Sequence, residues 1–214
     1  MKKQQTGFTL IELAIVLVII GLLLGGVLKG QELINSAKVK NMSTDFRNIP
    51  VYIYGYQDKF KALPGDDRQA TAHNGSTTQG NGNGQIEGVW NSEDEGEESV
   101  MFWEHVRKAG LAPGGTDIAD AADTGFYPTN ADGGRVGVST VLPIQGQSGA
   151  YFMCSAGILG KYAKQIDTTI DDGLSNGGSL RATEASGADE FAEAGEEVAE
   201  AYEDGTSYTL CMGF

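Results

Sequence analysis

Apolar residues follow two different patterns along the first 60 positions of the chain. Residues 8–28 form a run of 21 positions in which Glu12 is the only charged side chain. Because a helix rises about 1.5 Å per residue, such a run spans roughly 30 Å, the thickness of a bilayer core. After Lys29 the apolar positions recur at intervals of three and four, which indicates a helical stripe: Val39, Met42, Phe46, Ile49, Ile53, Tyr56 and Phe60. The pattern predicts one long helix over residues 8–60, apolar all round at first and then packed by one face.

Residues 61–214 have the pattern of a small head rich in loops. Gly and Asn are dense over residues 73–91, which predicts a loop, and charged residues at both ends of 99–110 predict a short helix. Alternating and β-branched positions predict three strands, at 135–142, 149–154 and 206–212. Two further helices are expected, at 158–166 and in the acidic stretch 188–203. The fold class is therefore α+β, with the long helix laid against a small antiparallel sheet.

Charge is distributed unevenly between the N-terminal segment and the rest of the chain. Residues 1–40 carry five Lys against two Glu, a net of +3, whereas the remaining residues carry ten basic against 27 acidic side chains, a net of −17. An acidic body repels phosphate backbones. We therefore expect no nucleic-acid binding by the head. His73 and His105 are the two histidines, and neither zinc nor an enzymatic nucleophile–base arrangement is indicated, so we expect a protein that is not an enzyme.

Glu12 separates three interpretations of the apolar run. A secretory signal peptide has a shorter apolar core and a small-residue cleavage site, which this sequence lacks. A plain membrane anchor explains the length of the run but gives no reason for a carboxylate in it. A charge at that depth costs about 2.5–3.5 kcal/mol on insertion scales, so it is expected to have a partner and a function. A third class of segment accounts for both features.

The stretch KKQQTG/FTLIELAIVLVIIGLL resembles the leader and N-terminal helix of type IV pilins and type II secretion pseudopilins. The resemblance implies that a prepilin peptidase cuts after Gly7 and methylates the new N-terminal Phe8. It also implies that Glu12 pairs with the N-terminal amine of a neighbouring subunit during assembly, an arrangement in which a cation neutralises a buried carboxylate. The chain would then divide into a leader (1–7), a transmembrane and assembly segment (8–28), an amphipathic segment (29–60) and a globular head (61–214).

The same resemblance implies a structural subunit, a pilin or minor pilin of a type IV pilus-like filament. Its partners would be copies of itself or other pilins, the prepilin peptidase and the inner-membrane assembly machinery. It would lie in the bacterial inner membrane before assembly, and afterwards in a surface pilus or a periplasmic pseudopilus. A type II secretion pseudopilin is the same-class alternative, and a single-span membrane-anchored binding protein is the alternative from another class. Adhesion, motility, DNA uptake and secretion stay open as roles.

Two further predictions concern residues of the head, a disulfide and a calcium site. Cys154 and Cys211 would face an oxidising environment, each in a strand-like segment, and pilins often carry a comparable C-terminal disulfide loop, so we expect them to be bonded. No cofactor is indicated except calcium, which stabilises the heads of some pseudopilins. The weak calcium candidates are oxygen-bearing side chains near glycines: Asn81, Asn83, Glu87, Asp171 and Asp172.

Overall fold

The computed structural model describes residues 9–118, 125–184 and 195–214. The chain divides into two compact units between Lys38 and Val39, and helix α1 (Leu10–Phe60) runs through the division. Helix α1 contains two parts with different surfaces, the apolar segment (residues 10–28) and the striped segment (residues 39–60). The predicted long helix is confirmed, and Pro50 lies inside it.

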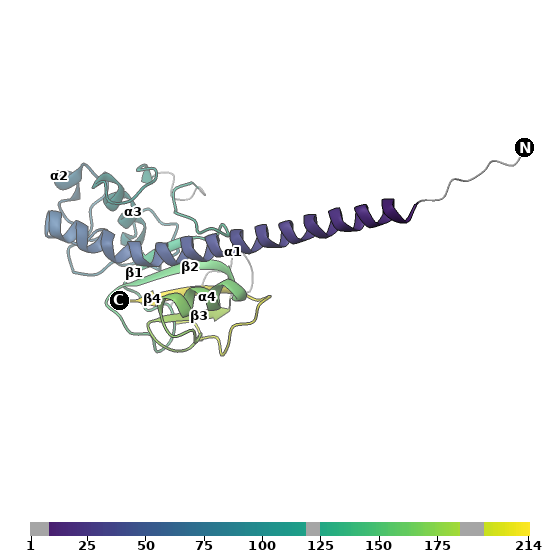
Figure 1. Cartoon of the computed structure of the whole chain (residues 1–214). Helices are drawn as coiled ribbons and strands as arrows, with labels where there is room; N and C mark the ends of the chain where they lie inside the picture. The colour runs from purple at the N-terminus through teal and green to yellow at the C-terminus, as the bar shows by residue number, and fades with distance from the viewer. Residues whose placement is uncertain (1–8, 119–124, 185–194) are drawn as a thin grey trace, which may run out of the picture. The chain divides into compact units, whose positions relative to one another are not determined.

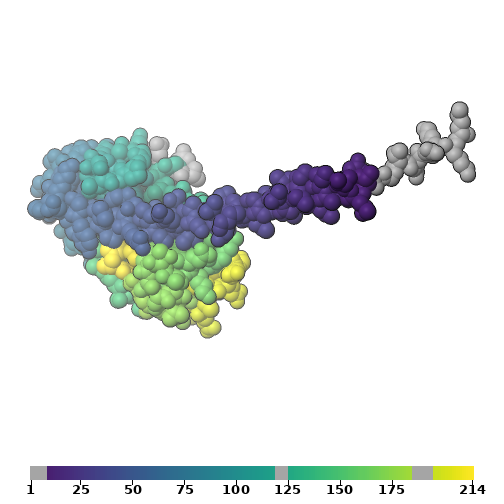
Figure 2. All heavy atoms as spheres, in the orientation of Figure 1, coloured from purple at the N-terminus to yellow at the C-terminus, as the bar shows by residue number. Residues whose placement is uncertain are grey.

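The apolar segment carries its large hydrophobic side chains uncovered. Between Leu10 and Leu28 these side chains are 45% to 89% exposed, and Figure 2 shows them along the purple part of the helix. This is the one helix among the described residues that is long and apolar enough to cross a membrane. Its surface therefore requires an apolar environment, which the described residues do not supply.

The striped segment packs by one face into the core of the second unit. Val39, Met42, Phe46, Ile49, Ile53 and Tyr56 are all buried, as the three-and-four spacing predicts. They belong to one cluster with apolar side chains of the sheet and of α3 (Glu98–Lys108), so the helix forms one wall of the core. Figure 1 shows this part of α1 running alongside the sheet.

The sheet has four antiparallel strands in the order β1-β2-β4-β3. The strands are β1 (Val136–Ser139), β2 (Phe152–Leu159), β3 (Leu180–Glu184) and β4 (Ser207–Gly213). Short α2 (Ala70–Asn74) precedes α3, and α4 (Gly160–Ile170) directly follows β2. The predicted α+β class and the helix near 99–110 are confirmed, and three predicted strands are present with shifted ends.

The helix expected at 158–166 is present as α4 with a shifted start, whereas the helix expected at 188–203 is absent from the residues described there. Residues 158–159, expected in a helix, close strand β2 instead, because a bulge after Ser155 lets Ile158 pair with Tyr208. The stretch 188–203 was expected to be helical, and of its residues 195–203 are described. They form an irregular segment that starts with Gly195 at φ +80° and donates the Ala199 N–H to Ala182 of β3. In this segment, hydrogen bonding to β3 overrides the helical propensity of the Ala and Glu residues.

Candidate functional site

The first turn of α1 contains a hydrogen-bonded box formed by Thr9 and Glu12. The Glu12 carboxylate accepts the Thr9 backbone N–H at 2.8 Å and the Thr9 hydroxyl at 2.7 Å. The Glu12 N–H in turn donates to the Thr9 hydroxyl oxygen at 3.3 Å. This is a capping box, which satisfies backbone donors that the helix cannot pair internally. The Thr-Leu-Ile-Glu spacing carries the signal for it in the sequence.

The capping box shows how the isolated chain accommodates a charge in an apolar helix. Both bonds to Glu12 end on the same carboxylate oxygen, Oε2, so the other oxygen stays available to a further donor. The side chain is exposed, and in the described chain its bonds come from Thr9. Gly7 and Phe8, the predicted cleavage and methylation positions, lie outside the described residues.

Cys154 and Cys211 form a disulfide, as expected from the sequence. They lie directly opposite each other on β2 and β4, with an S–S distance of 2.07 Å. Both side chains are fully buried, and the bond closes a loop with a sequence separation of 57 residues. The loop contains α4 and β3, so the bond ties the C-terminal half of the head to the centre of the sheet.

The first group of calcium candidates lies in a loop that is organised around a carboxylate. Backbone N–H groups of Gly82, Asn83 and Gly84 donate to the two oxygens of buried Asp66, at 3.0 Å for Asn83 and 2.7 Å for Gly84. The side-chain amides of Asn81 and Asn83 donate to Glu87 at 2.7 and 2.9 Å. The loop therefore points donors inward at an anion, as backbone nests do.

The second group of calcium candidates lies closer together. The carboxylates of Asp167, Asp171 and Asp172 place oxygens within 4.8 Å of one another, a spacing that could hold a cation. Burial raises the pKa of Asp167, which accepts hydrogen bonds from Tyr202 at 2.6 Å and from the Gly173 N–H at 3.0 Å. Asp171 accepts the N–H groups of residues 179 and 180, so these oxygens already hold the turn before β3. Asp167, Asp171 and Asp172 therefore remain a predicted calcium site.

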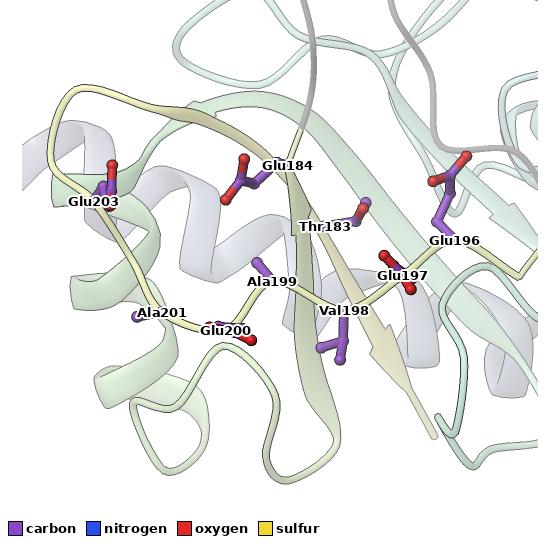
Figure 3. A pocket seen from close by; sticks show the side chains of 9 residues that line it. All are labelled: Thr183, Glu184, Glu196, Glu197, Val198, Ala199, Glu200, Ala201 and Glu203. Carbon is purple, nitrogen blue, oxygen red and sulfur yellow. The ribbon is translucent and has the colours of Figure 1, made fainter.

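An acidic groove of about 510 Å³ follows the edge of β3. Five glutamates line it from β3 and from the segment 195–203: Glu184, Glu196, Glu197, Glu200 and Glu203. Figure 3 shows their carboxylates spread along the two segments and not converging on one point. Among the described residues they form no group with the spacing of metal ligands. The groove therefore concentrates part of the strong negative charge of the head.

A buried polar cluster that sequence reasoning missed fixes the loop before α3 to that helix. Glu104 is fully buried, accepts hydrogen bonds from the backbone and hydroxyl groups of Thr77 and Thr78, and pairs with Lys108 at 2.8 Å. Burial alone would raise the pKa of Glu104, but these bonds outweigh it and lower the pKa to about 2. Nothing in the local sequence pairs Glu104 with the threonines, which come together through the fold.

The comparison with known protein families decides the class of the N-terminal segment. Residues 2–28 match the model of the prokaryotic N-terminal methylation motif. With the long apolar helix, this motif fits a type IV pilin or a pseudopilin. The resemblance drawn from the sequence is thereby confirmed. No curated protein and no solved structure matches the chain.

Proposed function

We propose that the chain is a pilin or minor pilin, a structural subunit of a type IV pilus-like filament assembled from the inner membrane. The observation that carries this proposal is the methylation motif on a helix whose large apolar side chains are 45% to 89% exposed. A helix of this kind satisfies its apolar surface either in lipid or against other helices of the same kind. Assembly exchanges the first environment for the second, so the role is mechanical and not catalytic.

Processing by a prepilin peptidase prepares the subunit for this exchange. The peptidase removes a leader of residues 1–7 by cutting between Gly7 and Phe8, and Phe8 becomes the methylated N-terminus. Residues 8–28 then anchor and assemble the subunit, residues 29–60 link that segment to the head, and residues 61–214 form the filament exterior. The motif supports the same steps for a type II secretion pseudopilin, whose filament stays in the periplasm.

Glu12 provides the contact that selects correctly placed neighbours. Its free Oε1 oxygen can accept the N-terminal amine of a second subunit while Oε2 holds Thr9, so pairing does not require the first turn to unwind. In an apolar layer an unpaired carboxylate is strongly disfavoured, and a matching ammonium removes that penalty. The free energy of assembly therefore depends on the charge of Glu12 and not on its hydrogen bonds alone.

The substitution Glu12→Gln tests the proposed function. Glutamine also forms capping boxes and has nearly the same shape, so the first turn and membrane insertion are retained while the charge is lost. We expect the protein to accumulate in the inner membrane and filaments sheared from cells to be reduced by more than about tenfold, as expected for loss of a desolvated charge pair.

Glu32→Gln is the matched control, because Glu32 lies on the same helix in an exposed ion pair with Lys29 at 2.7 Å. Exposed pairs contribute little, so this variant is expected to assemble normally. Normal filaments from Glu12→Gln would contradict the proposed role. Recovery of wild-type filaments from the cell surface, as opposed to the periplasm, separates a pilin from a pseudopilin.

A further inference from the structure

A small cleft opens beside the striped segment of α1, within the second unit. Its volume is about 210 Å³. The side chains of α1 that line it are Asp45, Asn48, Ile49 and Tyr52. Mostly apolar residues complete the walls: Trp103, Ala112, Pro113, Pro128, Thr129 and Val136. The space suits one extended side chain with an apolar stem.

Two polar groups of this cleft have no hydrogen-bond partner among the described residues. Trp103 is 3% exposed, and its indole N–H is buried without an acceptor. Asp45 is half-buried, and no described residue donates to its carboxylate. Burial raises the pKa of Asp45 to about 6 because nothing nearby compensates its charge. Buried polar groups in native proteins are nearly always paired, whereas the half-buried Asp45 carboxylate still reaches solvent and so remains open to a charged partner from outside the chain.

The chemistry of the missing partner follows from the Asp45 carboxylate and the apolar walls around it. An unpaired carboxylate among apolar walls is complemented by a cation on an apolar stem, which describes a lysine side chain. A simple metal ion would meet one carboxylate and apolar carbon, which is not a ligand set for a hard cation.

Lys40 of α1 has the charge and the position to fill this role between copies of the chain. Its side chain is exposed, and no hydrogen bond or ion pair joins its ammonium group to another of the described residues. Lys40 and Asp45 are five residues apart on one helix, which places them about 7.5 Å apart along its axis and about 140° apart around it. They therefore point away from each other within one chain.

The same offset suits contact between two parallel copies of α1. A neighbour displaced along the axis by about one and a half turns brings its Lys40 level with Asp45 of the first copy. Lys40 and Asp45 lie on different faces of the helix. The Lys40 of each copy can therefore contact the Asp45 of one neighbour, while its own Asp45 contacts the Lys40 of a second neighbour. Such a head-to-tail contact does not close on itself and repeats along a helical array.

We propose that this cleft receives the Lys40 side chain of a second copy, whose ammonium pairs with Asp45. This inference rests on the proposed filament and adds to it a second charge contact, in the head and not in the apolar segment. It assigns to Asp45 the role of a lateral receptor and explains why a half-buried carboxylate is kept without a partner in the single subunit.

Cysteine cross-linking in assembled filaments tests the pairing directly. The native cysteines are bonded and buried, so Lys40→Cys combined with Asp45→Cys introduces the reactive thiols. After mild oxidation we expect a ladder of covalent oligomers on a non-reducing gel. The matched control, Lys164→Cys with Asp45→Cys, carries the same number of thiols but should stay monomeric. Intact double-cysteine filaments that give no ladder would overturn the proposal.

Charge exchange provides an independent test. Lys40→Asp should reduce filament recovery by more than about tenfold, because like charges brought together at an interface oppose association. Asp45→Lys should do the same, and the variant carrying both changes should recover filaments. Lys164→Asp, on the surface of α4, is the control of equal charge change. Asp45→Asn keeps the size of the side chain and should also reduce filament recovery. It therefore keeps the test valid if Asp45→Lys fails to fold.

The outcomes separate this inference from the proposed function. Filaments that are lost with Glu12→Gln but are indifferent to Lys40→Asp would overturn the Lys40–Asp45 contact alone. Absence of filaments from the wild-type chain under all assembly conditions would overturn both. Restoration by the double exchange supports both.

Discussion

The apolar and striped segments of α1 are parts of one continuous helix, yet they satisfy their hydrophobic surface in different ways. Ile53 in the striped segment is fully buried, whereas Ile15 in the apolar segment is 54% exposed. The striped segment concentrates apolar side chains on one face and covers them with its own head. The apolar segment distributes them all round, which no single packing partner can cover. The comparison teaches that one continuous helix can combine a segment whose apolar side chains are buried in its own head with a segment whose apolar side chains are exposed.

Loss of the disulfide should have the largest effect, and it should be confined to the head. Replacing both Cys154 and Cys211 by Ala removes a constraint on a loop with a separation of 57 residues. The chain-entropy model gives about 4 kcal/mol for such a loop. Denaturant unfolding of the full chain in detergent, followed by near-ultraviolet circular dichroism, measures this loss. Loss of helical signal from residues 10–38 at the same denaturant concentration would show that the two segments do not behave independently.

The same substitution at one isoleucine of each segment tests the comparison between the striped and apolar segments. Ile53→Ala empties a site in a packed core and is expected to lower the free energy of unfolding of the head by about 3 kcal/mol. Ile15→Ala removes the same atoms from an exposed surface and should leave that free energy within about 0.5 kcal/mol of wild type. Equal losses from the two substitutions would contradict the division of roles along α1.

Asp45 should give a smaller and pH-dependent effect. Its pKa of about 6 in the folded chain lies above the usual unfolded value, because burial disfavours the charged form. The folded state therefore holds the proton more tightly, so the destabilising effect of the charge is complete above pH 6 and disappears as the pH falls toward 4.

Asp45→Asn should accordingly stabilise the unassembled subunit above pH 6 by about 1 kcal/mol, a figure reduced for the partial exposure of the side chain. At pH 4 the two proteins should have the same stability. Chemical unfolding at pH 7.5 and pH 4 measures the difference, and Asp58→Asn, an exposed position on the same helix, is the control. A difference that grows as the pH falls would show that the assigned sign is wrong.

The sequence predicts those parts of the molecule whose structure is set by periodicity or by charge along the chain. The stripe from Val39 to Tyr56 is set by periodicity, because its burial follows directly from the spacing, and the helix near residues 99–110 is set by charge, because charged residues mark both of its ends. The cysteine pair is predictable once the compartment is inferred. The methylation motif is equally local, since its residues are contiguous.

The remaining features depend on contacts that are distant in sequence. Strand β3 (Leu180–Glu184) lacks a strong alternating pattern and exists because β4 pairs with it. The end of β2 was assigned to a helix because the bulge after Ser155 has no signal of its own. The capping box of Thr9 and Glu12 is local, because the Thr-Leu-Ile-Glu spacing alone indicates it. The cleft at Asp45 requires residues from three parts of the chain, so no linear pattern could predict it.

The intact mass of the mature protein tests the central claim most directly, because in the proposed function the apolar segment enters a filament only after the leader is removed. Protein recovered from the cell surface or from filaments should lack residues 1–7 and carry one added methyl group on Phe8. Gly7→Val is the variant that should retain the leader and remain in the membrane. A mass that includes Met1 in assembled or surface-exposed wild-type protein would contradict the account.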